Sequence, residues 1–379
     1  MMTERHVLIT GGAGFIGINL AQKLVGDGYK VSILDNLSPQ IHGHYPAQDE
    51  KLLRDERVNF IRADVRQVGV LQAIVEKVEA IVHLAAETGT AQSMYQIAHY
   101  NDVNVQATAQ LLDILANNPH SVKKIVLASS RSIYGEGAYR CKTHGDVYPG
   151  ARNASQLKNH QWDPLCPICG AAVSAIPTPE SARPSPASIY AATKYAQEDL
   201  IRIAGDSLGI GTAILRFQNV YGAGQSLNNP YTGILSIFST RIRRGMSLPI
   251  FEDGLESRDF VHVSDIVQAI QLALESEAAN GATFNVGAGE PTSVLDIANM
   301  LVDAFGGTVR PTVTGQYRLG DIRHCYADLT QIREKLGFEP KMTLKKGIEE
   351  FTSWVLSQPL PEDGLDKANE ELKKRKMMS

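Results

Sequence analysis

Short apolar runs that alternate with amphipathic stretches constrain the fold of this chain more than any other feature. Six runs have the composition of β-strands: 6–10, 30–35, 58–64, 80–86, 123–130 and 212–217. The stretch 92–117 has helical spacing instead, carried by Met94, Ile97, Leu111, Leu112 and Leu115. Strands that alternate with helices form right-handed βαβ units, which bury a parallel sheet on both faces. The pattern predicts an α/β fold with a Rossmann-type, doubly wound parallel sheet.

The 379 residues are enough for one large core or two moderate ones. Three segments are expected to build the dinucleotide-binding domain: 1–135, 188–221 and 260–287. Two others are expected to build a smaller C-terminal substrate-binding domain: 222–259 and 288–355. Residues 136–187 then form an insert, and the charged tail 356–379 is expected to be a solvated helix.

The balance of charged and apolar residues argues against several classes of partner. A net charge of −4 gives no reason to expect nucleic acid or a membrane surface. No apolar run at the start is long enough for a signal peptide, and none approaches the ~20 residues that span a bilayer. Four cysteines in a chain of this length do not make a disulfide scaffold. We therefore expect a cytoplasmic protein that binds neither nucleic acid nor membranes.

A glycine-rich turn directly follows the first predicted strand. The stretch TGGAGFIG places Gly11, Gly14 and Gly17 at a G-x-x-G-x-x-G spacing and opens a helix. Glycines there permit a tight turn and let backbone N–H groups approach a pyrophosphate at the helix N-terminus. Asp35 ends the second strand, where an acid accepts hydrogen bonds from both ribose hydroxyls and repels a 2′-phosphate. These residues predict NAD rather than NADP; the alternative is a structural glycine turn with a capping aspartate.

Two later strand ends agree with a dinucleotide site, because open α/β sheets bind ligands beyond the carboxyl ends of their strands. Asp64 ends the third strand before Val65, where an acid can meet the adenine amino group. The small residues of Leu84-Ala85-Ala86 end the fourth and leave room for the cofactor.

Candidate catalytic residues follow the fifth strand. Ser130 ends that strand, and SIYAATK places Tyr190 and Lys194 four apart, on one face of a helix. A free tyrosine has a pKa near ~10 and is a poor base at neutral pH. A nearby lysine ammonium stabilises the phenolate, and Ser130 can hydrogen-bond the same substrate hydroxyl. The three residues predict a tyrosine general base, although a Y-x-x-x-K pair alone is common on helices.

Three of the four cysteines lie between these catalytic residues. Cys141 and His144 form C-x-x-H, Cys166 and Cys169 form C-x-x-C, and a glycine follows each pair. Two such pairs some 20 residues apart suit one tetrahedral, structural zinc in a zinc-ribbon-like insert. The polar segment between them could hardly fold without a metal crosslink. The alternatives are free cysteines with a surface histidine, or His160 as a substitute ligand.

Together these motifs resemble the extended short-chain dehydrogenase/reductase family, in particular its NAD-dependent nucleotide-sugar epimerases and dehydratases. The resemblance continues in RFQNVYGAGQ (216–225), SRDFVHVSD (257–265) and YRLGDIRHCYAD (317–328), so it covers nearly everything except about 136–187. It implies that Phe217 borders the nicotinamide, Asn219 touches the sugar or its diphosphate, and Phe251 stacks on the nucleotide base. Arg258 and Arg318 would neutralise the diphosphate, since guanidinium groups suit phosphate oxygens.

Motifs and resemblance together give two sets of expected binding residues. The expected NAD site consists of Gly11, Gly14, Phe15, Ile16, Gly17, Asp35, Asn36, Asp64, Val65, Leu84, Ala85, Ala86, Asn104, Ser129, Tyr190, Lys194 and Phe217. The expected substrate site consists of Glu87, Ser130, Asn219, Thr232, Phe251, Arg258 and Arg318.

The two positions after Ser130 separate the reactions of this family. The family's 4,6-dehydratases carry an Asp-Glu pair there, and its decarboxylases carry a glutamate at the second position. Arg131 and Ser132 stand there in this chain and cannot supply that acid and base. An epimerase needs no further acid–base group, so the resemblance implies a nucleotide-sugar 4-epimerase with tightly bound NAD. The alternatives are a dehydratase, a decarboxylase or a reductase, and a non-catalytic NAD sensor.

A narrower resemblance concerns the sugar. The stretches NLSPQIHG (36–43), QSMYQI (92–97) and SIYGEG (132–137), with the cysteine insert, are similar to dTDP-6-deoxyhexose 4-epimerases of the dTDP-L-rhamnose type. A loop of Glu87-Thr88-Gly89 departs from that pattern and leaves a UDP-linked sugar open. The family also implies a homodimer, formed through the helix that carries Tyr190.

Overall fold

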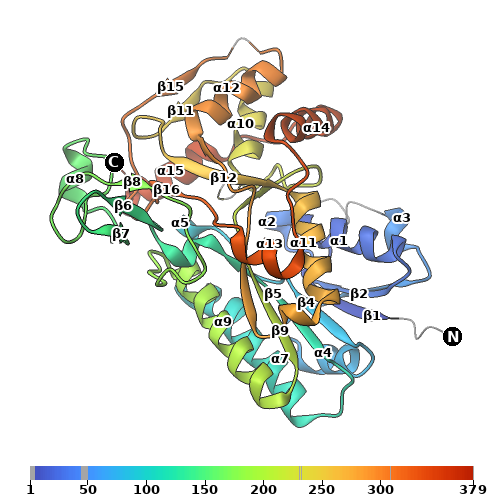
Figure 1. Ribbon diagram of the computed structural model, residues 1–379. Helices are drawn as coiled ribbons and strands as arrows, with labels where there is room; N and C mark the ends of the chain where they lie inside the picture. The colour runs from blue at the N-terminus through green and yellow to red at the C-terminus, as the bar shows by residue number, and fades with distance from the viewer. Residues whose placement is uncertain (1–4, 44–49, 230, 232, 308, 379) are drawn as a thin grey trace.

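A seven-stranded parallel sheet forms the centre of the molecule (Figure 1). The structure is a computed structural model that describes residues 5–43, 50–229, 231, 233–307 and 309–378. In spatial order the strands are β13 (Ala282–Val286), β9 (Gly211–Phe217), β5 (Lys124–Ser130), β4 (Ala80–His83), β1 (His6–Thr10), β2 (Lys30–Asp35) and β3 (Val58–Arg62). All neighbouring pairs are parallel. The chain reverses direction across the sheet between β1 and β4, which is where such sheets bind dinucleotides.

The central strands are apolar throughout because both faces of the sheet are covered. In β1, Val7 and Ile9 belong to the core on one face and Leu8 belongs to the core on the other. Helices α1 (Phe15–Gly26), α11 (Val263–Glu275) and α13 (Thr330–Leu336) pack on the first face. Helices α4 (Val68–Val75), α7 (Ala107–Asn117) and α9 (Ile189–Leu208) pack on the second. This arrangement confirms the predicted doubly wound α/β fold.

The predicted helix over 92–117 is interrupted. The segment contains α5 (Thr90–Ser93), α6 (Ile97–Tyr100), a π-helical stretch at Asn101–Gln106 and then α7. Gln96 leaves the helical conformation with φ −115° and ψ 41°. Met94 and Ile97 are exposed while Leu111 is buried, so the helical spacing of these residues does not correspond to one continuous helix.

A second region lies above the sheet in Figure 1 and has its own core around Phe238, Leu301 and Phe351. One of its sheets consists of β10 (Asn219–Tyr221), β12 (Ser257–His262), β14 (Pro291–Ser293) and β16 (His324–Cys325), and the other of β11 (Leu248–Ile250) and β15 (Pro311–Val313). Its helices are α10 (Ile234–Arg243), α12 (Val294–Ala304) and α14 (Leu344–Ser357). Short helices elsewhere are α2 (Pro39–His42), α3 (Glu50–Leu53), and the 3₁₀ turns η2 (Arg131–Tyr134) and η3 (Glu277–Ala279).

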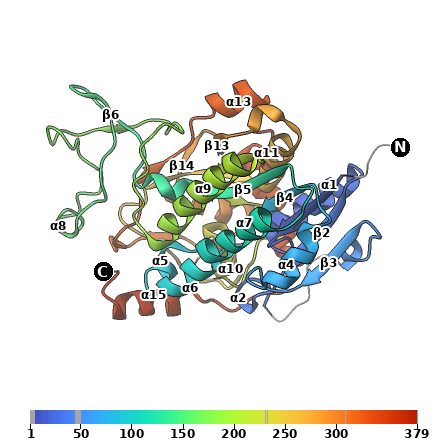
Figure 2. The ribbon, with the colours of Figure 1, turned by 90° about the horizontal axis from the view of Figure 1, so that it is seen from below.

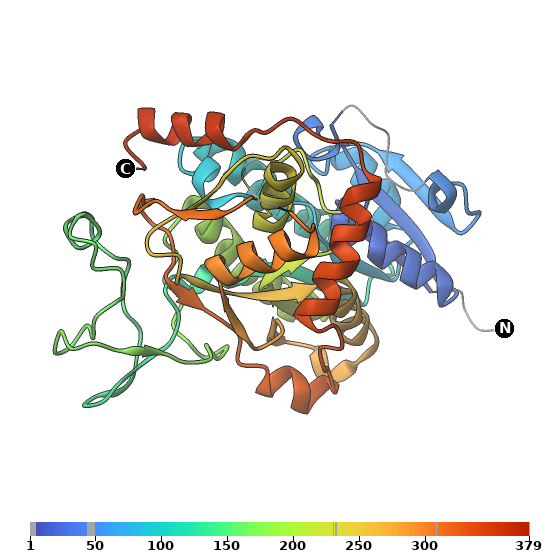
Figure 3. The same ribbon diagram turned by 90° about the horizontal axis from the view of Figure 1, so that it is seen from above.

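The insert leaves the sheet after η2 and returns at α9. It contains β6 (Tyr139–Cys141), β7 (Gly145–Val147), α8 (Ala154–Lys158) and β8 (Ser174–Ala175), with β6 between the other two strands. Figures 2 and 3 show the insert projecting from the body of the molecule. Its ends are therefore fixed beside the predicted catalytic residues, while its tip extends outward.

The C-terminal segment forms α15 (Leu365–Lys374), as the charge pattern suggested, but one face of this helix is buried. Leu365, Ala368 and Leu372 are all less than 7% exposed. The helix lies beside α5 and α6 (Figures 2 and 3), where Glu371 accepts a hydrogen bond from the Tyr95 hydroxyl at 3.1 Å. The expectation of a solvated tail is thus wrong for this face, because the apolar residues recur at helical spacing among the charges. In the described part of the chain, no helix combines the length and apolar character that crossing a membrane requires.

Candidate active site and metal cluster

The glycine turn after β1 forms one wall of a cavity at the carboxyl edge of the sheet. Gly11 has φ +66°, and a Cβ atom there would lie 2.9 Å from backbone atoms of Ala85. A Cβ atom at Gly17 would lie 2.5 Å from the backbone of Gly12. Only glycine fits at these two positions, so the turn allows the first N–H groups of α1 to face the cavity.

This cavity has a volume of about 280 Å³ and lies over the ends of β1, β2 and β4. The predicted cofactor residues that line it are Gly11, Gly14, Phe15, Ile16, Gly17, Asp35, Asn36, Asp64, Val65, Leu84, Ala85 and Ala86. The predicted ones outside its lining are Asn104, Ser129, Tyr190, Lys194 and Phe217. Lining residues that were not predicted individually are Leu34, Ser38, Ile41, His42, Ala63, Thr88, Val103, Gln225, Ser226 and Asn229. Most of these come from residues 38–42 and 225–229, where the sequence predicted no role for single side chains.

Asp35 is buried beneath the glycine turn. Its carboxylate accepts hydrogen bonds from the Ala13 N–H at 3.1 Å and from the Leu37 N–H at 2.8 Å. His42 lies 3.5 Å from the same carboxylate. These bonds fix the acid at the edge of the cavity, where each oxygen can accept a further hydrogen bond.

Asp64 lines the cavity with its carboxylate already engaged. Arg66 donates to both of its oxygens, at 2.8 and 2.9 Å, and the Asn36 amide donates at 3.0 Å. These hydrogen bonds, that of Arg66 foremost, hold the pKa of Asp64 far below its usual range. An adenine amino group that donates to Asp64, as expected, would therefore bind a carboxylate that already pairs with Arg66.

The predicted catalytic residues meet where β5 ends against the start of α9. Ser188 caps α9 by accepting a hydrogen bond from the Ala191 N–H at 3.2 Å, which places Tyr190 in the first turn. Burial raises the pKa of Tyr190, while hydrogen bonding with Ser130 and the positive charge of Arg131 oppose that rise. Burial lowers the pKa of Lys194 to about 7, against the opposing charge of Glu198. Ser130 and Tyr190 are thus in contact, and Lys194 lies one turn further along the same helix.

A buried ion pair beneath Lys194 carried no sequence signal. Arg216 on β9 donates to both carboxylate oxygens of Glu198, and Glu198 also accepts a hydrogen bond from Ser129. Ser129, predicted to touch the cofactor, instead ties β5 to α9 through this carboxylate. Asn104, also predicted as a cofactor contact, donates to the Glu87 carbonyl at 3.1 Å and to Thr193 at 3.0 Å.

The predicted substrate residues lie in the second region and on its border with the sheet. The guanidinium of Arg318 lies 4.7 Å from the ring centre of Phe251 and donates to Asn369 at 2.7 Å. Arg258 is 9% exposed and donates to the backbone carbonyls of Ser257 and Arg323. Thr232 lies outside the described residues.

Arg131 links the catalytic and substrate residues. Its Nε donates to the Asn219 side chain at 2.9 Å, and its buried Nη1 has no hydrogen-bond partner among the described residues. Burial and the nearby charge of Arg258 lower the pKa of Arg131, and they outweigh Cys325 and Asp321, which raise it. An unsatisfied buried N–H at this point is a donor available to a ligand oxygen.

Glu87 lines the cavity next to the sugar side of the predicted site. Its carboxylate lies 3.2 Å from His99 Nε2, and its N–H donates to Asn104 at 2.8 Å. The side chain is 23% exposed, so it faces the cavity rather than bulk solvent.

The four predicted metal ligands come together in the insert. Their donor atoms all lie within 4.8 Å of one another. His144 Nδ1 is 3.6 Å from the sulfurs of both Cys141 and Cys166, and the Cys141 and Cys169 sulfurs are 3.9 Å apart. Bonds of about 2.3 Å to sulfur and 2.1 Å to nitrogen give a tetrahedron with edges of about 3.8 and 3.6 Å, so the residues fit zinc.

The local backbone favours the thiolate of Cys141. Hydrogen bonds from the backbone N–H groups of Thr143 and His144 lower the pKa of Cys141 to about 6. The glycines behind the two pairs have φ of +69° at Gly145 and +71° at Gly170. His160 is not part of the cluster; its ring stacks on Trp162 at 5.0 Å.

Comparison with known proteins agrees with this geometry. Residues 7–153 and 167–287 match the NAD dependent epimerase/dehydratase family. A dTDP-L-rhamnose 4-epimerase from Burkholderia thailandensis is 38% identical over 94% of this chain and 97% of that protein. The crystal structure of UDP-glucose 4-epimerase from Thermotoga maritima with UDP-glucose is 29% identical, covers 92% of this chain and 98% of its own, and has a TM-score of 0.75. That of UDP-glucuronic acid 4-epimerase from Bacillus cereus, in complex with UDP-glucuronic acid and NAD, is 25% identical, covers 93% and 99%, and has a TM-score of 0.75.

Proposed function

The chain belongs to the NAD dependent epimerase/dehydratase family and is a nucleotide-sugar 4-epimerase, and we propose that its substrate is a dTDP-linked 6-deoxyhexose such as dTDP-L-rhamnose. The identity of the sugar rests on the similarity to the Burkholderia enzyme along 94% of the chain. The solved neighbours carry UDP-sugars, so a UDP-linked donor is the competing substrate.

The observation that carries epimerisation is the chemistry of the two residues after Ser130. Ser132 donates to the Ser130 hydroxyl at 2.8 Å, and Arg131 donates to Asn219. Neither can act as the carboxylate acid or base that elimination of water requires. Among the described residues where β5 ends against α9, Tyr190 is therefore the proposed general base, which suits a reaction that removes and returns a single hydroxyl proton.

The residues have distinct proposed roles. Tyr190 takes the proton of the sugar 4-hydroxyl, Ser130 hydrogen-bonds the same oxygen, and Lys194 stabilises the phenolate electrostatically. The glycine turn and Asp35 would hold NAD, which would supply the capacity to take up the hydride of carbon 4 and to return it. Phe251, Arg258 and Arg318 hold the nucleotide while the sugar turns.

Proton NMR of the purified protein with dTDP-L-rhamnose, without added cofactor, tests this function. We expect a new anomeric signal from the carbon-4 epimer, approaching the same ratio from either sugar. UDP-glucose and UDP-glucuronic acid are assayed in parallel to rank the donors. Formation of a 4-keto-6-deoxy sugar or a pentose would contradict epimerisation, and turnover of UDP-sugars alone would contradict the dTDP-linked substrate.

We propose that Cys141, His144, Cys166 and Cys169 hold one structural zinc. The four donors leave no position for water or substrate, which suits a structural rather than a catalytic ion. Metal analysis should find one zinc per chain in the native protein and none in the Cys166→Ser, Cys169→Ser variant. A native protein purified without chelator that contains no zinc would contradict this assignment.

We also propose a homodimer through α9. Ile203 on this helix is 59% exposed in the single chain, so it is available to a partner subunit. Light scattering should give twice the 41.3 kDa chain mass for the native protein, and Ile203→Glu should shift it toward the monomer.

A further inference from the structure

The insert reaches the nucleotide-binding region through one buried arginine. Arg152 has a side chain only 2% exposed, and its guanidinium donates to two groups outside the insert. These are the Glu252 carboxylate at 2.8 Å and the Asp321 carbonyl at 2.9 Å. Within the insert it donates to the Trp162 carbonyl at 2.9 Å and to Glu136 at 3.2 Å. All its hydrogen-bonding ends are therefore occupied by protein.

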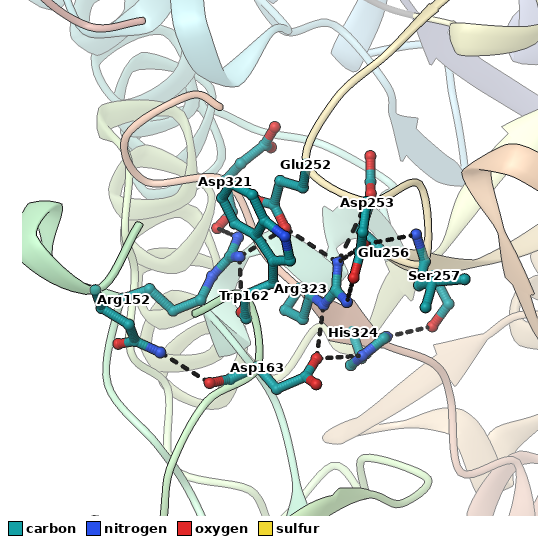
Figure 4. A network of polar contacts seen from close by, with 12 residues as sticks. Arg152, Trp162, Asp163, Glu252, Asp253, Glu256, Ser257, Asp321, Arg323 and His324 are labelled. Carbon is teal, nitrogen blue, oxygen red and sulfur yellow. Dashed lines mark hydrogen bonds and ion pairs between the residues drawn. The ribbon is translucent and has the colours of Figure 1, made fainter. Parts of the chain in front are cut away.

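A second buried arginine makes the reciprocal contact. Arg323 belongs to the nucleotide-binding region, and its Nε donates to Asp163 of the insert at 2.8 Å (Figure 4). Its other nitrogens donate to both oxygens of Asp253, at 2.7 and 2.8 Å, and to Glu252 at 3.1 Å. The Glu252 carboxylate thus bridges the arginine pair, Arg152 and Arg323.

The segments held by the arginine pair carry the proposed nucleotide contacts. Glu252 directly follows Phe251, the proposed stacking partner of the base. The carbonyl of Arg323 accepts a hydrogen bond from Arg258 at 3.2 Å. Asp321, held through its carbonyl by Arg152, lies three residues after Arg318 in the same loop.

The backbone at Glu252 is strained in a way that these contacts explain. Its φ is +50°, a left-handed conformation that non-glycine residues rarely adopt. Such strain persists where the surrounding structure over-determines it. Here the Glu252 N–H donates to the Gln316 carbonyl at 2.7 Å while its carboxylate is fixed by the arginine pair.

Aromatic side chains also join the insert to the loop that carries Arg318. His160 and Trp162 of the insert stack at 5.0 Å, and Trp162 lies 6.3 Å from Tyr317, the neighbour of Arg318. Gly315 lies against the His160 ring, since a Cβ atom there would be 3.5 Å from its Cε1. Gly315, Tyr317, Asp321 and Arg323 of this loop therefore contact the insert, while Arg318 and Leu319 pair with Met378 and Met377 of the C-terminal segment.

We propose that the insert is a positioning element of the nucleotide site: through Arg152 and Asp163 it sets the conformation of the Phe251–Asp253 turn and of the loop that carries Arg318. The proposal rests on the proposed function for the identity of the ligand. The metal cluster would then affect nucleotide affinity indirectly. It fixes the strands β6 and β7, which precede Arg152 and Asp163 in the chain. In the described part of the chain, neither Arg152 nor Asp163 contacts the catalytic residues Ser130, Tyr190 and Lys194.

Calorimetric titration with dTDP and with UDP, on the full-length protein, tests this inference. Arg152→Gln removes the charge that holds Glu252 and is expected to weaken binding of the preferred nucleotide at least 10-fold. Its NAD and zinc contents should equal those of the native protein. In turnover assays its KM should rise by a similar factor, with kcat at saturation changed less than 2-fold.

Two further proteins guard against a folding defect. Asp163→Asn removes one charged contact to Arg323 at a more exposed position and is expected to weaken binding about 3-fold. Arg140→Gln is the matched control, because it breaks an ion pair with Asp146 on the outer surface of the same insert, where the side chains are 61% and 49% exposed. It should bind as the native protein does. Chelation of the zinc should reproduce the Arg152→Gln defect, with recovery when zinc is added back.

The outcomes separate this inference from the proposed function. Native-like affinity in both Arg152→Gln and Asp163→Asn overturns the positioning role, even when epimerisation is observed. Weakened binding in these variants, with no epimerisation by the native protein, supports the positioning role and overturns the proposed reaction. A native protein that binds neither nucleotide overturns both.

Discussion

Arg216 donates to Glu198 through two parallel hydrogen bonds, Nε to Oε1 at 3.0 Å and Nη2 to Oε2 at 2.7 Å. The pair is buried, and it ties the catalytic helix α9 to β9 one helical turn beyond Lys194. Its position makes the placement of the proposed base depend on Arg216, a residue of the sheet rather than of α9.

Glu198→Gln should destabilise the fold strongly, because it leaves the Arg216 charge buried with no counter-charge in the pair. Loss of one partner of a buried pair costs about 3–5 kcal/mol of unfolding free energy. Urea denaturation measures the change. Arg202→Gln is the matched control on the same helix; its pair with Asp199 is about half exposed and should contribute less than about 1 kcal/mol. Equal effects of the two variants would contradict the special role of the buried pair.

Tyr190→Phe should abolish most turnover while leaving the fold intact. Removal of a general base typically lowers kcat by about 10²–10⁴-fold. The ring still fills its place, so the NAD content measured after denaturation should be unchanged. Turnover within 10-fold of the native enzyme would assign the proton transfer to another group.

Lys194→Met should move the acid limb of the pH–rate profile to higher pH. Burial already raises the pKa of Tyr190, and removal of the ammonium that stabilises its phenolate raises it further. The phenolate then forms only at higher pH, so activity at neutral pH falls and partly recovers in alkaline buffer. An unshifted limb with a uniformly lower rate would indicate that Lys194 serves the cofactor alone.

Glu256→Gln should stabilise the protein at alkaline pH. Burial raises the pKa of Glu256 to about 7, against an unfolded value of 4.5, so the folded state binds the extra proton. Ionisation above pH 7 therefore costs stability, and that cost is largely absent below pH 4.5. At about 1.4 kcal/mol per pKa unit, the neutral glutamine should add about 3 kcal/mol at pH 8 and about 1 kcal/mol at pH 5. Urea denaturation at both pH values, with exposed Glu290→Gln as control, should show this difference; a gain independent of pH would contradict it.

Features that follow from local rules could be read from the sequence. The Gly11 turn, Asp35 at its strand end and the Tyr190–Lys194 spacing each follow from the geometry of one element. The structure places Gly11 and Asp35 around one cavity, and Tyr190 and Lys194 on the helix α9. The paired spacing of Cys141 and Cys166 with their neighbours likewise predicted a cluster that the fold assembles.

Contacts between residues that lie far apart in the chain could not be predicted from the sequence. Glu136 accepts a hydrogen bond from the Arg323 N–H although 187 positions separate them, and no local pattern pairs the two residues. In the sequence, Arg131 was informative only because the family's dehydratases carry an acid at that position. Its hydrogen bond to Asn219 became visible only in the structure. The buried face of α15 was missed because its charges outnumber the three apolar residues that decide its packing.

The path of the chain between Ser130 and Tyr190 bears on the order of folding. The insert lies between the two residues in sequence, so their contact closes a long loop. Loop-closure entropy grows only logarithmically, by about 0.6 kcal/mol for each doubling of length. Capture of a metal by sulfurs 28 positions apart, Cys141 and Cys169, shortens that loop but changes its closure cost little. The sheet and α9 can therefore assemble around the catalytic serine and tyrosine whether or not metal has yet been captured, and a shortage of zinc during synthesis should leave a folded, NAD-loaded protein with a disordered lobe.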